Sequence, residues 1–211
     1  MAELKTISQF KSKLRGGGSR ANLFEVEIPS FPAAALDLTD WGSGSDQEQD
    51  KFRFLCKAAQ LPASNVAAID VPFRGRILKV AGDRTFDTWT VTIINDEDFR
   101  LRTSFEQWMN AMSSLTTNTG ATDPGSYMAD AYVHQLGRGL EKLRSTATPD
   151  VEQGEIFAPL RSYKFFDIFP TNVSAIDLSY DTSDEIEEFT VEFQVQYWNA
   201  LATDQTGESI N

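Results

Sequence analysis

Cysteine and histidine are nearly absent from this sequence of 211 residues, which contains one of each, Cys56 and His134. A single cysteine excludes an intrachain disulfide framework and a cysteine-rich metal site. Cys56 lies in the strand-like run FRFLCKA, where a thiol behaves as a small apolar group. His134 stands in YVHQL without a nucleophile beside it, and the chain lacks the GxSxG pattern of a nucleophile elbow. We therefore predict a protein that is not an enzyme, with a triad assembled from distant residues as the alternative.

Long apolar runs and phosphate-binding motifs are also missing. No apolar stretch approaches the ~20 residues needed to cross a bilayer, so we expect no membrane span and no stable membrane anchor. The N-terminal segment MAELKTISQFKSKLR has no apolar centre, which argues against a secretory signal and for initial residence in a cytoplasm. The glycine-rich RGGGSR lacks the GxxxxGKS/T and GxGxxG spacings and precedes a strand pattern. No cofactor is expected.

Basic residues are missing from the C-terminal part of the chain. No lysine or arginine follows Lys164, whereas ten acidic residues do, so most of the net charge of -12 lies there. The first twenty residues are basic, and this polarity favours head-to-tail attraction between copies. The chain offers no concentrated basic surface, which disfavours sequence-specific DNA binding.

The acidic residues cluster in the string YDTSDEIEEF, which covers 180–189. Clustered carboxylates can bind calcium or supply a catalytic pair. The spacing does not match an EF-hand loop, however, and Asp and Ser are ordinary turn residues. We interpret the string as a solvated turn between two strand patterns, with a metal site as the alternative.

Apolar residues at every second position predict a mainly β protein. The predicted strands centre on Phe24–Ile28, Phe52–Cys56, Trp89–Ile93, Ile176–Tyr180 and, as the longest, Ile186–Tyr197. A further strand is predicted over Tyr127–Leu136, where the sequence also permits a helix.

One helix is predicted over Asp98–Met112. Its apolar residues fall on one helical stripe, at Leu101, Phe105, Trp108 and Met112. Asp96 or Asp98 is the candidate N-cap. An amphipathic helix buries its stripe, so we expect this one to pack against a sheet.

Turn-forming residues mark the loops and the domain organisation. They are concentrated in Ala33–Asp50, Ser113–Ser126 and Gly137–Gly154, and Gly16–Ser19 has the composition of a flexible joint. We expect one domain over 1–211, with an N-terminal arm at 1–20 and insertions at about 33–50 and 113–160.

Four segments carry a family resemblance. They are ANLFEVEI (21–28), FLCKAAQLPA (54–63), VAGDRTFDTWTVTIINDED (80–98) and FPTNVSAIDLSYDTSDEIEEFTVEFQVQYW (169–198). In this order, and above all in the strings GDRTFDTW and FPTNV, the sequence resembles the tail tube proteins of contractile-tailed bacteriophages. The resemblance covers a little over half of the chain.

The resemblance implies a protomer of two packed antiparallel sheets, a β-sandwich or barrel, with one flanking α-helix. Strands of neighbouring protomers join in a hexameric ring, and rings stack into the hollow tail tube of the virion, which is assembled in the host cytoplasm. The implied partners are the tail sheath protein, the baseplate, the tape-measure protein and the tail terminator. On sheath contraction the tube is driven through the host envelope, and the phage genome passes along the lumen without sequence-specific binding.

The polar members of alternating strands are our candidates for the wall of the lumen, because successive side chains of a strand face opposite sides. The first set is Thr190, Glu192, Gln194 and Gln196, and the second is Thr88, Thr90 and Thr92. A neutral or acidic wall gives phosphate no counterion-releasing contacts. An ordinary outer solvent face is the alternative.

A second candidate surface joins protomers or stacked rings. The segment Pro72–Phe86, predicted as a turn-rich connection between strands, carries Arg74, Arg76, Lys79, Asp83 and Arg84. We expect its cations to meet a neighbour's acidic residues Asp184, Glu185, Glu187 and Glu188. A solvated hairpin is the alternative.

Two other functions compete with a phage tail tube. One is the inner tube of a related contractile injection system that delivers protein cargo. The other, from a different class, is a β-sandwich ligand-binding module, which predicts a monomer or a small oligomer.

Overall fold

The computed structural model describes residues 6–14, 18–32, 45–144, 152–181, 184–203 and 209–210. Most of the predicted insertion at 33–50, part of the glycine joint and the centre of the predicted loop at 137–154 lie outside the described residues. The chain divides into two compact units. The first contains residues 1–25, 133–163 and 200–211, and the second contains 26–132 and 164–199.

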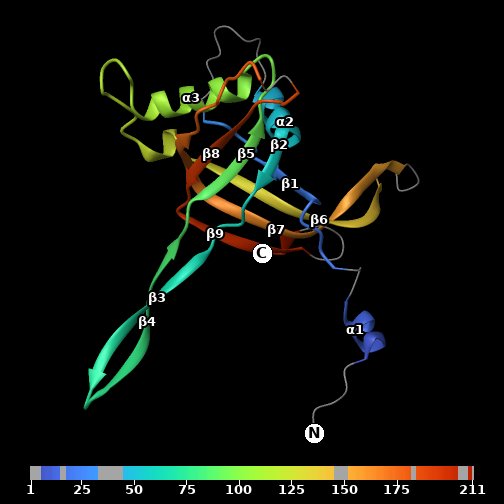
Figure 1. The fold of residues 1–211 in the computed structure, drawn as a ribbon, viewed down its shortest axis with the longest axis vertical. Helices are drawn as coiled ribbons and strands as arrows, with labels where there is room; N and C mark the ends of the chain where they lie inside the picture. Colours follow the sequence, from blue (N-terminus) through green and yellow to red (C-terminus); the bar gives the residue numbers. More distant parts are fainter. Residues whose placement is uncertain are drawn as a thin grey trace. The chain divides into compact units, whose positions relative to one another are not determined.

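The fold is mainly β, with three α-helices among the described residues (Figure 1). The helices are α1 (Ile7–Lys13), α2 (Ser45–Leu55) and α3 (Arg100–Met112), followed by the short 3-10 helix η3 (Pro124–Ser126). The strands are β1 (Phe24–Glu27), β2 (Cys56–Ala59), β3 (Ser64–Phe73), β4 (Arg76–Phe86), β5 (Trp89–Ile94), β6 (Ala129–Arg144), β7 (Glu152–Val173), β8 (Glu188–Gln194), β9 (Tyr197–Thr203) and β10 (Ser209–Ile210).

The strands form two sheets. The larger has the order β1-β6-β7-β8-β5-β2, and β9 pairs with both β7 and β10. Strand β5 lies between β2 and β8 and is antiparallel to both. The smaller sheet is the antiparallel hairpin of β3 and β4.

The core of the second unit is rich in aromatic side chains contributed by the sheet and the two helices. Phe105 of α3 lies with its ring centroid 5.8 Å from that of Phe193 on β8 and 6.1 Å from that of Phe52 on α2. Trp89 of β5 stacks on Phe165 of β7 at 4.8 Å. All five side chains are fully buried, so α3 covers the apolar face of β5 and β8.

The helix predicted over Asp98–Met112 is present as α3. Leu101, Phe105 and Trp108 are buried as the stripe predicted, and the Trp108 indole donates a 2.6 Å hydrogen bond to the Tyr127 carbonyl oxygen. The helix begins at Arg100, and Phe99 at the N-cap position adopts a left-handed conformation with φ 53°. Asp98 still serves the helix start, because its carboxylate accepts a 3.1 Å hydrogen bond from the Arg100 backbone N–H.

The strand predicted over Phe52–Cys56 is wrong. Residues Ser45–Leu55 form α2, and only the segment from Cys56 onward is a strand. Phe52 is fully buried while Phe54 is 81% exposed, although residues two apart on a strand share a face. The preceding string SDQEQDK contains good helix formers, and the helix places Phe52 against α3. The predicted loop at Ala33–Asp50 is therefore helical from Ser45.

Three other element boundaries differ from the prediction. The strand Ile186–Tyr197 divides into β8 and β9, with a bend at Gln196. The segment Ile176–Tyr180 belongs to no strand. The predicted loop Gly137–Gly154 is strand up to Arg144 and again from Glu152, so β6 extends well beyond the predicted Tyr127–Leu136.

The predicted architecture also needs two corrections. Three helices, not one, accompany the sheets in the described part of the chain. The second sheet is an exposed two-stranded hairpin and not a layer packed on the first, because seven of its large apolar side chains are 42% to 66% exposed.

Candidate functional site

A polar face on β5 and β8 brings together residues from both sets predicted to line a lumen. In the antiparallel register, Thr90 lies opposite Glu192 and Thr92 lies opposite Thr190. Directly opposed residues point to the same side of a sheet. The intervening residues are buried beneath α3, so this polar row occupies the face turned away from that helix.

The remaining members of the two predicted sets lie at the margins of this face. Gln194 ends β8 and pairs with Phe169 of β7. Thr88 precedes β5 and is exposed, and Gln196 lies in the bend after β8. The alternation argument therefore does not extend to Thr88 and Gln196, and their place on a lumen stays a prediction.

The segment Pro72–Phe86 is itself a β-hairpin with its adjoining strand, not the predicted turn-rich connection between strands. Its turn is formed by Arg74 and Gly75, which have φ values of 45° and 82°. Two central residues with positive φ are typical of the type I′ turn, whose twist matches that of antiparallel strands. In Figure 1 the two strands extend side by side to this turn, away from α2 and α3.

The two faces of the hairpin differ in chemistry. Val71 lies opposite Leu78, and Ile69 lies opposite Val80. With Phe73, which lies opposite Arg76, these residues form an exposed surface that we name the apolar hairpin face. On the other face, Lys79 and Asp70 form an ion pair at 2.9 Å.

Several of the predicted contact residues already have partners within the chain. Lys79 pairs with Asp70, Glu188 pairs with Lys57, and Glu187 accepts a 3.0 Å hydrogen bond from the Asn95 amide. The Arg74 guanidinium lies 5.4 Å above the centre of the Phe73 ring at the hairpin tip. Asp184 and Glu185 are exposed, as are Arg76, Asp83 and Arg84. The structure leaves the contacts of these residues with a neighbour as a prediction.

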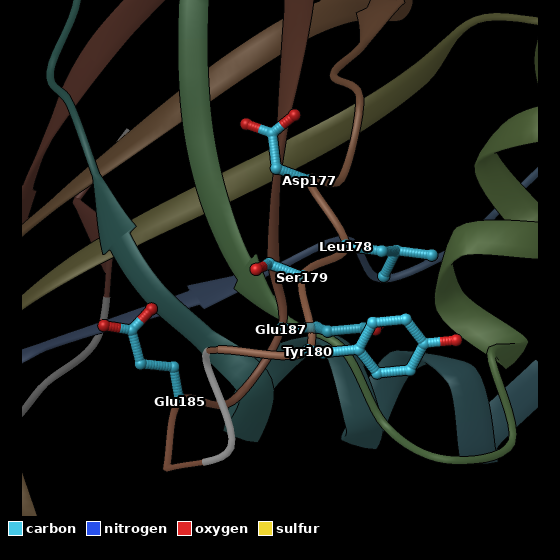
Figure 2. A pocket seen from close by; sticks show the side chains of 6 residues that line it. All are labelled: Asp177, Leu178, Ser179, Tyr180, Glu185 and Glu187. Atoms are coloured by element: carbon cyan, nitrogen blue, oxygen red, sulfur yellow. The ribbon is translucent and has the colours of Figure 1, made fainter.

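The segment from Ala175 to Tyr180 connects β7 to the acidic turn and borders an open pocket of about 420 Å³ (Figure 2). Figure 2 shows the side chains of Leu178 and Tyr180 pointing to one side of the chain and the Asp177 carboxylate pointing away from them. Leu178 is 80% exposed and Tyr180 fully exposed. The predicted period of two is therefore real, although no strand of the described chain pairs with this segment.

Sequence reasoning missed the apolar hairpin face because it selected Pro72–Phe86 for its cations. The alternation of Ile69, Val71 and Phe73 was the available signal. It also missed α1, whose capping box is formed by Thr6 and Gln9. The pattern of Thr followed three residues later by Gln is a known sign of a helix start.

Titratable groups elsewhere have local structural roles. Burial raises the pKa of the Cys56 thiol to about 12, so this cysteine is a poor nucleophile at neutral pH. The Asp130 carboxylate, 2.8 Å from the Lys164 ammonium, raises the pKa of that lysine. In the first unit, His134 Nδ1 lies 2.7 Å from the hydroxyl of the buried Ser162. Within the described residues no three acidic, histidine or cysteine side chains gather as metal ligands, and none of the described helices is long and apolar enough to cross a membrane.

Comparison with known proteins assigns the family. The model of a family described as phage tail tube protein matches residues 19–201. The tail tube protein gp19 of Enterobacteria phage T4 is 33% identical over 183 residues, which cover 87% of this chain and 92% of that protein. A tail tube protein of Serratia phage KSP90 is 24% identical over 201 residues, covering 94% and 98% of the two chains.

Solved structures agree with the fold. A chain from the baseplate of the anti-feeding prophage superposes with a TM-score of 0.55 at 10% identity, covering 88% of this chain and 96% of that one. The fold and the sequence similarity together define the class of protein, which is structural. The chain belongs to the phage tail tube protein family and is a structural component of a phage tail.

Proposed function

We propose that six copies of this chain close into a ring and that the rings stack into a hollow tube through which the phage genome leaves the virion. The observation that carries the proposal is the apolar hairpin face. An isolated two-stranded hairpin is marginal in water, and an exposed apolar sheet surface is an aggregation hazard. Its five large apolar side chains are all at least 42% exposed, and an exposed apolar patch of this kind marks a surface that binds a partner.

A second copy is the partner that fits this requirement. Contacts around a ring close on themselves, whereas head-to-tail contacts between rings continue indefinitely and yield a tube. A tube of that kind needs other proteins to start it and to stop it. We therefore propose a baseplate, a tape-measure protein and a tail terminator as partners, and a contractile sheath around the tube. Assembly takes place in the host cytoplasm.

The polar row of Thr90, Thr92, Thr190 and Glu192 is proposed as part of the lumen wall. It lies on the face of β5 and β8 opposite α3, so a helix covers one face and the other is available to water. The row contains a carboxylate and no cation, which prevents adhesion of the passing phosphates.

A related contractile device that delivers protein cargo remains the second candidate. The TM-score of 0.55 with a chain of the anti-feeding prophage baseplate supports a common fold for the two proteins. The greater sequence identity to the phage T4 protein favours genome delivery. Particles that carry this tube would contain DNA in the first case and protein in the second.

Two adjacent and equally exposed residues test the hairpin contact. Leu78 lies on the apolar hairpin face and is 64% exposed, while Ile77 lies on the opposite face and is 63% exposed. We expect Leu78→Lys to prevent ring stacking and Ile77→Lys to permit it, with equal melting temperatures for the unassembled proteins. Negative-stain electron microscopy and sedimentation of the purified chains measure the outcome. Normal tubes from Leu78→Lys would remove the hairpin face from the assembly contact, and a wild-type chain that stays monomeric at high concentration would contradict tube formation.

A further inference from the structure

Helix α1 carries an exposed apolar stripe. At about 3.6 residues per turn, Ile7, Phe10 and the C-cap residue Leu14 fall on one side of the helix. Their side chains are 76%, 65% and 45% exposed, and α1 has no buried residue. The helix is only seven residues long, and helices this short are marginal in water even with a capping box such as that of Thr6 and Gln9. The stripe therefore marks a docking surface.

The charges of α1 are arranged around this stripe. Helical periodicity places Lys11 and Lys13 on either side of it, whereas Ser8 and Ser12 lie on the far face. The helix contains no acidic residue. A lysine can lay its apolar stem along an apolar partner while its ammonium reaches a carboxylate. The helix therefore suits a partner that is apolar at its centre and acidic at its margins.

The connection from β7 to β8 (174–187), which we name the acidic connection, has these properties. Leu178 is 80% exposed and Tyr180 fully exposed, and both side chains point to one side (Figure 2). The open pocket that they border is also lined by three carboxylates, those of Asp177, Glu185 and Glu187. No cation follows Lys164 in the sequence, so the charge of the connection itself is wholly negative.

The backbone of the acidic connection is held in place by its own domain. The Arg102 guanidinium of α3 donates a 3.2 Å hydrogen bond to the Ser174 carbonyl oxygen, and the Asn95 backbone N–H donates one of 2.9 Å to the carbonyl oxygen of Glu187. The Ser174 hydroxyl also donates to the Ala175 carbonyl oxygen at 3.2 Å. The connection therefore offers side chains to a partner from a preformed backbone, which lowers the entropic cost of binding.

From this match we infer that α1 of one copy docks on the acidic connection of a second copy, with its stripe on Leu178 and Tyr180 and its lysines toward the surrounding carboxylates. The inference rests on the proposed tube and names a further contact between its subunits. The anchors Ile7, Phe10 and Leu14 have the i, i+3, i+7 spacing of helices that bind in grooves. Every copy carries one helix and one connection, so the contact is head-to-tail and each subunit repeats it.

Carboxylates placed on two faces of α1 test the docking. Phe10→Asp puts a charge into the stripe, and Ser8→Asp puts the same charge on the far face, near the helix start, where it favours the helix. We expect Phe10→Asp to raise the concentration needed for assembly about tenfold or more, because docking would bury the new charge. We expect Ser8→Asp to leave that concentration unchanged. Sedimentation and negative-stain electron microscopy of the full-length chains measure both.

Disulfide cross-linking tests whether the contact joins two copies. Chains with Phe10→Cys are assembled together with chains that carry Tyr180→Cys, both in a Cys56→Ser background, under mild oxidation. We expect a disulfide between two different chains, since two cysteines react only when their Cα atoms come within about 7 Å. Ser12→Cys, on the far face of α1, is the matched control and should give at least about tenfold less product.

The outcomes separate the docking from the tube itself. Wild-type tubes that lack this cross-link, with Phe10→Asp assembling as well as Ser8→Asp, would overturn the docking and leave the tube function standing. Cross-links that form only within one chain carrying both cysteines would also overturn it. So would a defect of Phe10→Asp seen only when sheath protein is present. Absence of any wild-type assembly would instead contradict the proposed function.

Discussion

Lys164 is held by groups on three sides within the second unit. Its ammonium lies 2.8 Å from the Asp130 carboxylate, 4.4 Å from the centre of the Phe166 ring and 5.5 Å from that of Tyr132. Asp130 also accepts a 3.3 Å hydrogen bond from the backbone N–H of Asp167, which has a positive φ of 52°. One carboxylate of β6 thus contacts a half-buried cation and the backbone of Asp167, both on β7, so this cluster links β6 to β7.

The cluster predicts a stability that depends on pH. Because the folded protein raises the pKa of Lys164 above its ordinary 10.5, its stabilising effect is fully present below that value and is lost as the pH rises through the folded pKa. We expect Lys164→Met to lower the free energy of unfolding by about 1 kcal/mol at pH 8. The difference from wild type should shrink above pH 10.5. Urea unfolding at both pH values measures it.

Lys57→Met is the matched control. Lys57 also pairs with a carboxylate, that of Glu188, but its side chain is 54% exposed, compared with 22% for Lys164. An exposed ion pair contributes less than about 1 kcal/mol. Equal losses in the two variants would show that the aromatic enclosure of Lys164 adds nothing.

At the scale of elements, two variants of the hairpin turn distinguish the effect of backbone geometry from the effect of charge. A Cβ added at Gly75 would meet no atom within 4 Å, so the positive φ is the main obstacle to a substitution there. We expect Gly75→Val to disorder the hairpin and to abolish assembly while the core melts at the wild-type temperature. Arg74→Asn should preserve the hairpin, because Asn tolerates a left-handed conformation in a type I′ turn.

Limited proteolysis of the unassembled chains measures the order of the hairpin in these two variants. Thermal unfolding monitored by circular dichroism measures the melting temperature of the core. Gly75→Val should be cut within the hairpin faster than Arg74→Asn. If Gly75→Val forms normal tubes, a preformed turn is not needed for assembly.

The elements that the sequence predicted well are those with one buried face. Strand β5 and helix α3 show clean periods of two and of about 3.6, because α3 and the sheet bury each other. The run FRFLC misled the prediction because Phe52 and Phe54 mimic alternation, while the pairing of Phe52 with Phe105 is a tertiary contact that no local pattern records. The segment around Leu178 and Tyr180 has the alternation of a strand, although it belongs to no strand of the described chain.

The candidate surfaces were only partly predictable for a related reason. Alternation placed Glu192 and Thr190 on one face, but which face α3 covers depends on contacts such as Phe105 with Phe193. The charge of the hairpin was visible in the sequence. Its apolar face was not recognised, because the prediction treated Pro72–Phe86 as a turn-rich connection and selected it for its cations.

At the scale of the whole molecule, the charge of the proposed lumen affects genome passage. Repulsion between Glu192 and passing phosphates acts over about a Debye length, ~8 Å at physiological salt. We expect phage carrying Glu192→Lys and Gln194→Lys to build intact tubes and to eject DNA more slowly. Ejection triggered in vitro and followed by a DNA-binding dye measures the rate.

The single variant Glu192→Lys is compared with a charge change of the same size elsewhere. Glu97 is exposed in the turn before α3, and Glu97→Lys alters the net charge as much as Glu192→Lys does. DNA ejection should be slower for Glu192→Lys than for the wild type, and unchanged for Glu97→Lys. Equal ejection rates in these two variants would show that the row on β5 and β8 does not face the DNA.

The exposed hairpin has a consequence for the life of the chain before assembly. Because five apolar side chains are uncovered on one face, we expect an unassembled protomer to associate as its concentration rises, and any copy it meets can cover that face wrongly as well as correctly. The rate of synthesis must therefore stay matched to the rate at which growing tubes consume subunits. In the proposed tube, each added copy would cover the hairpins of the one before and bring its own, so the growing tip would keep the same apolar surface until a different protein caps it.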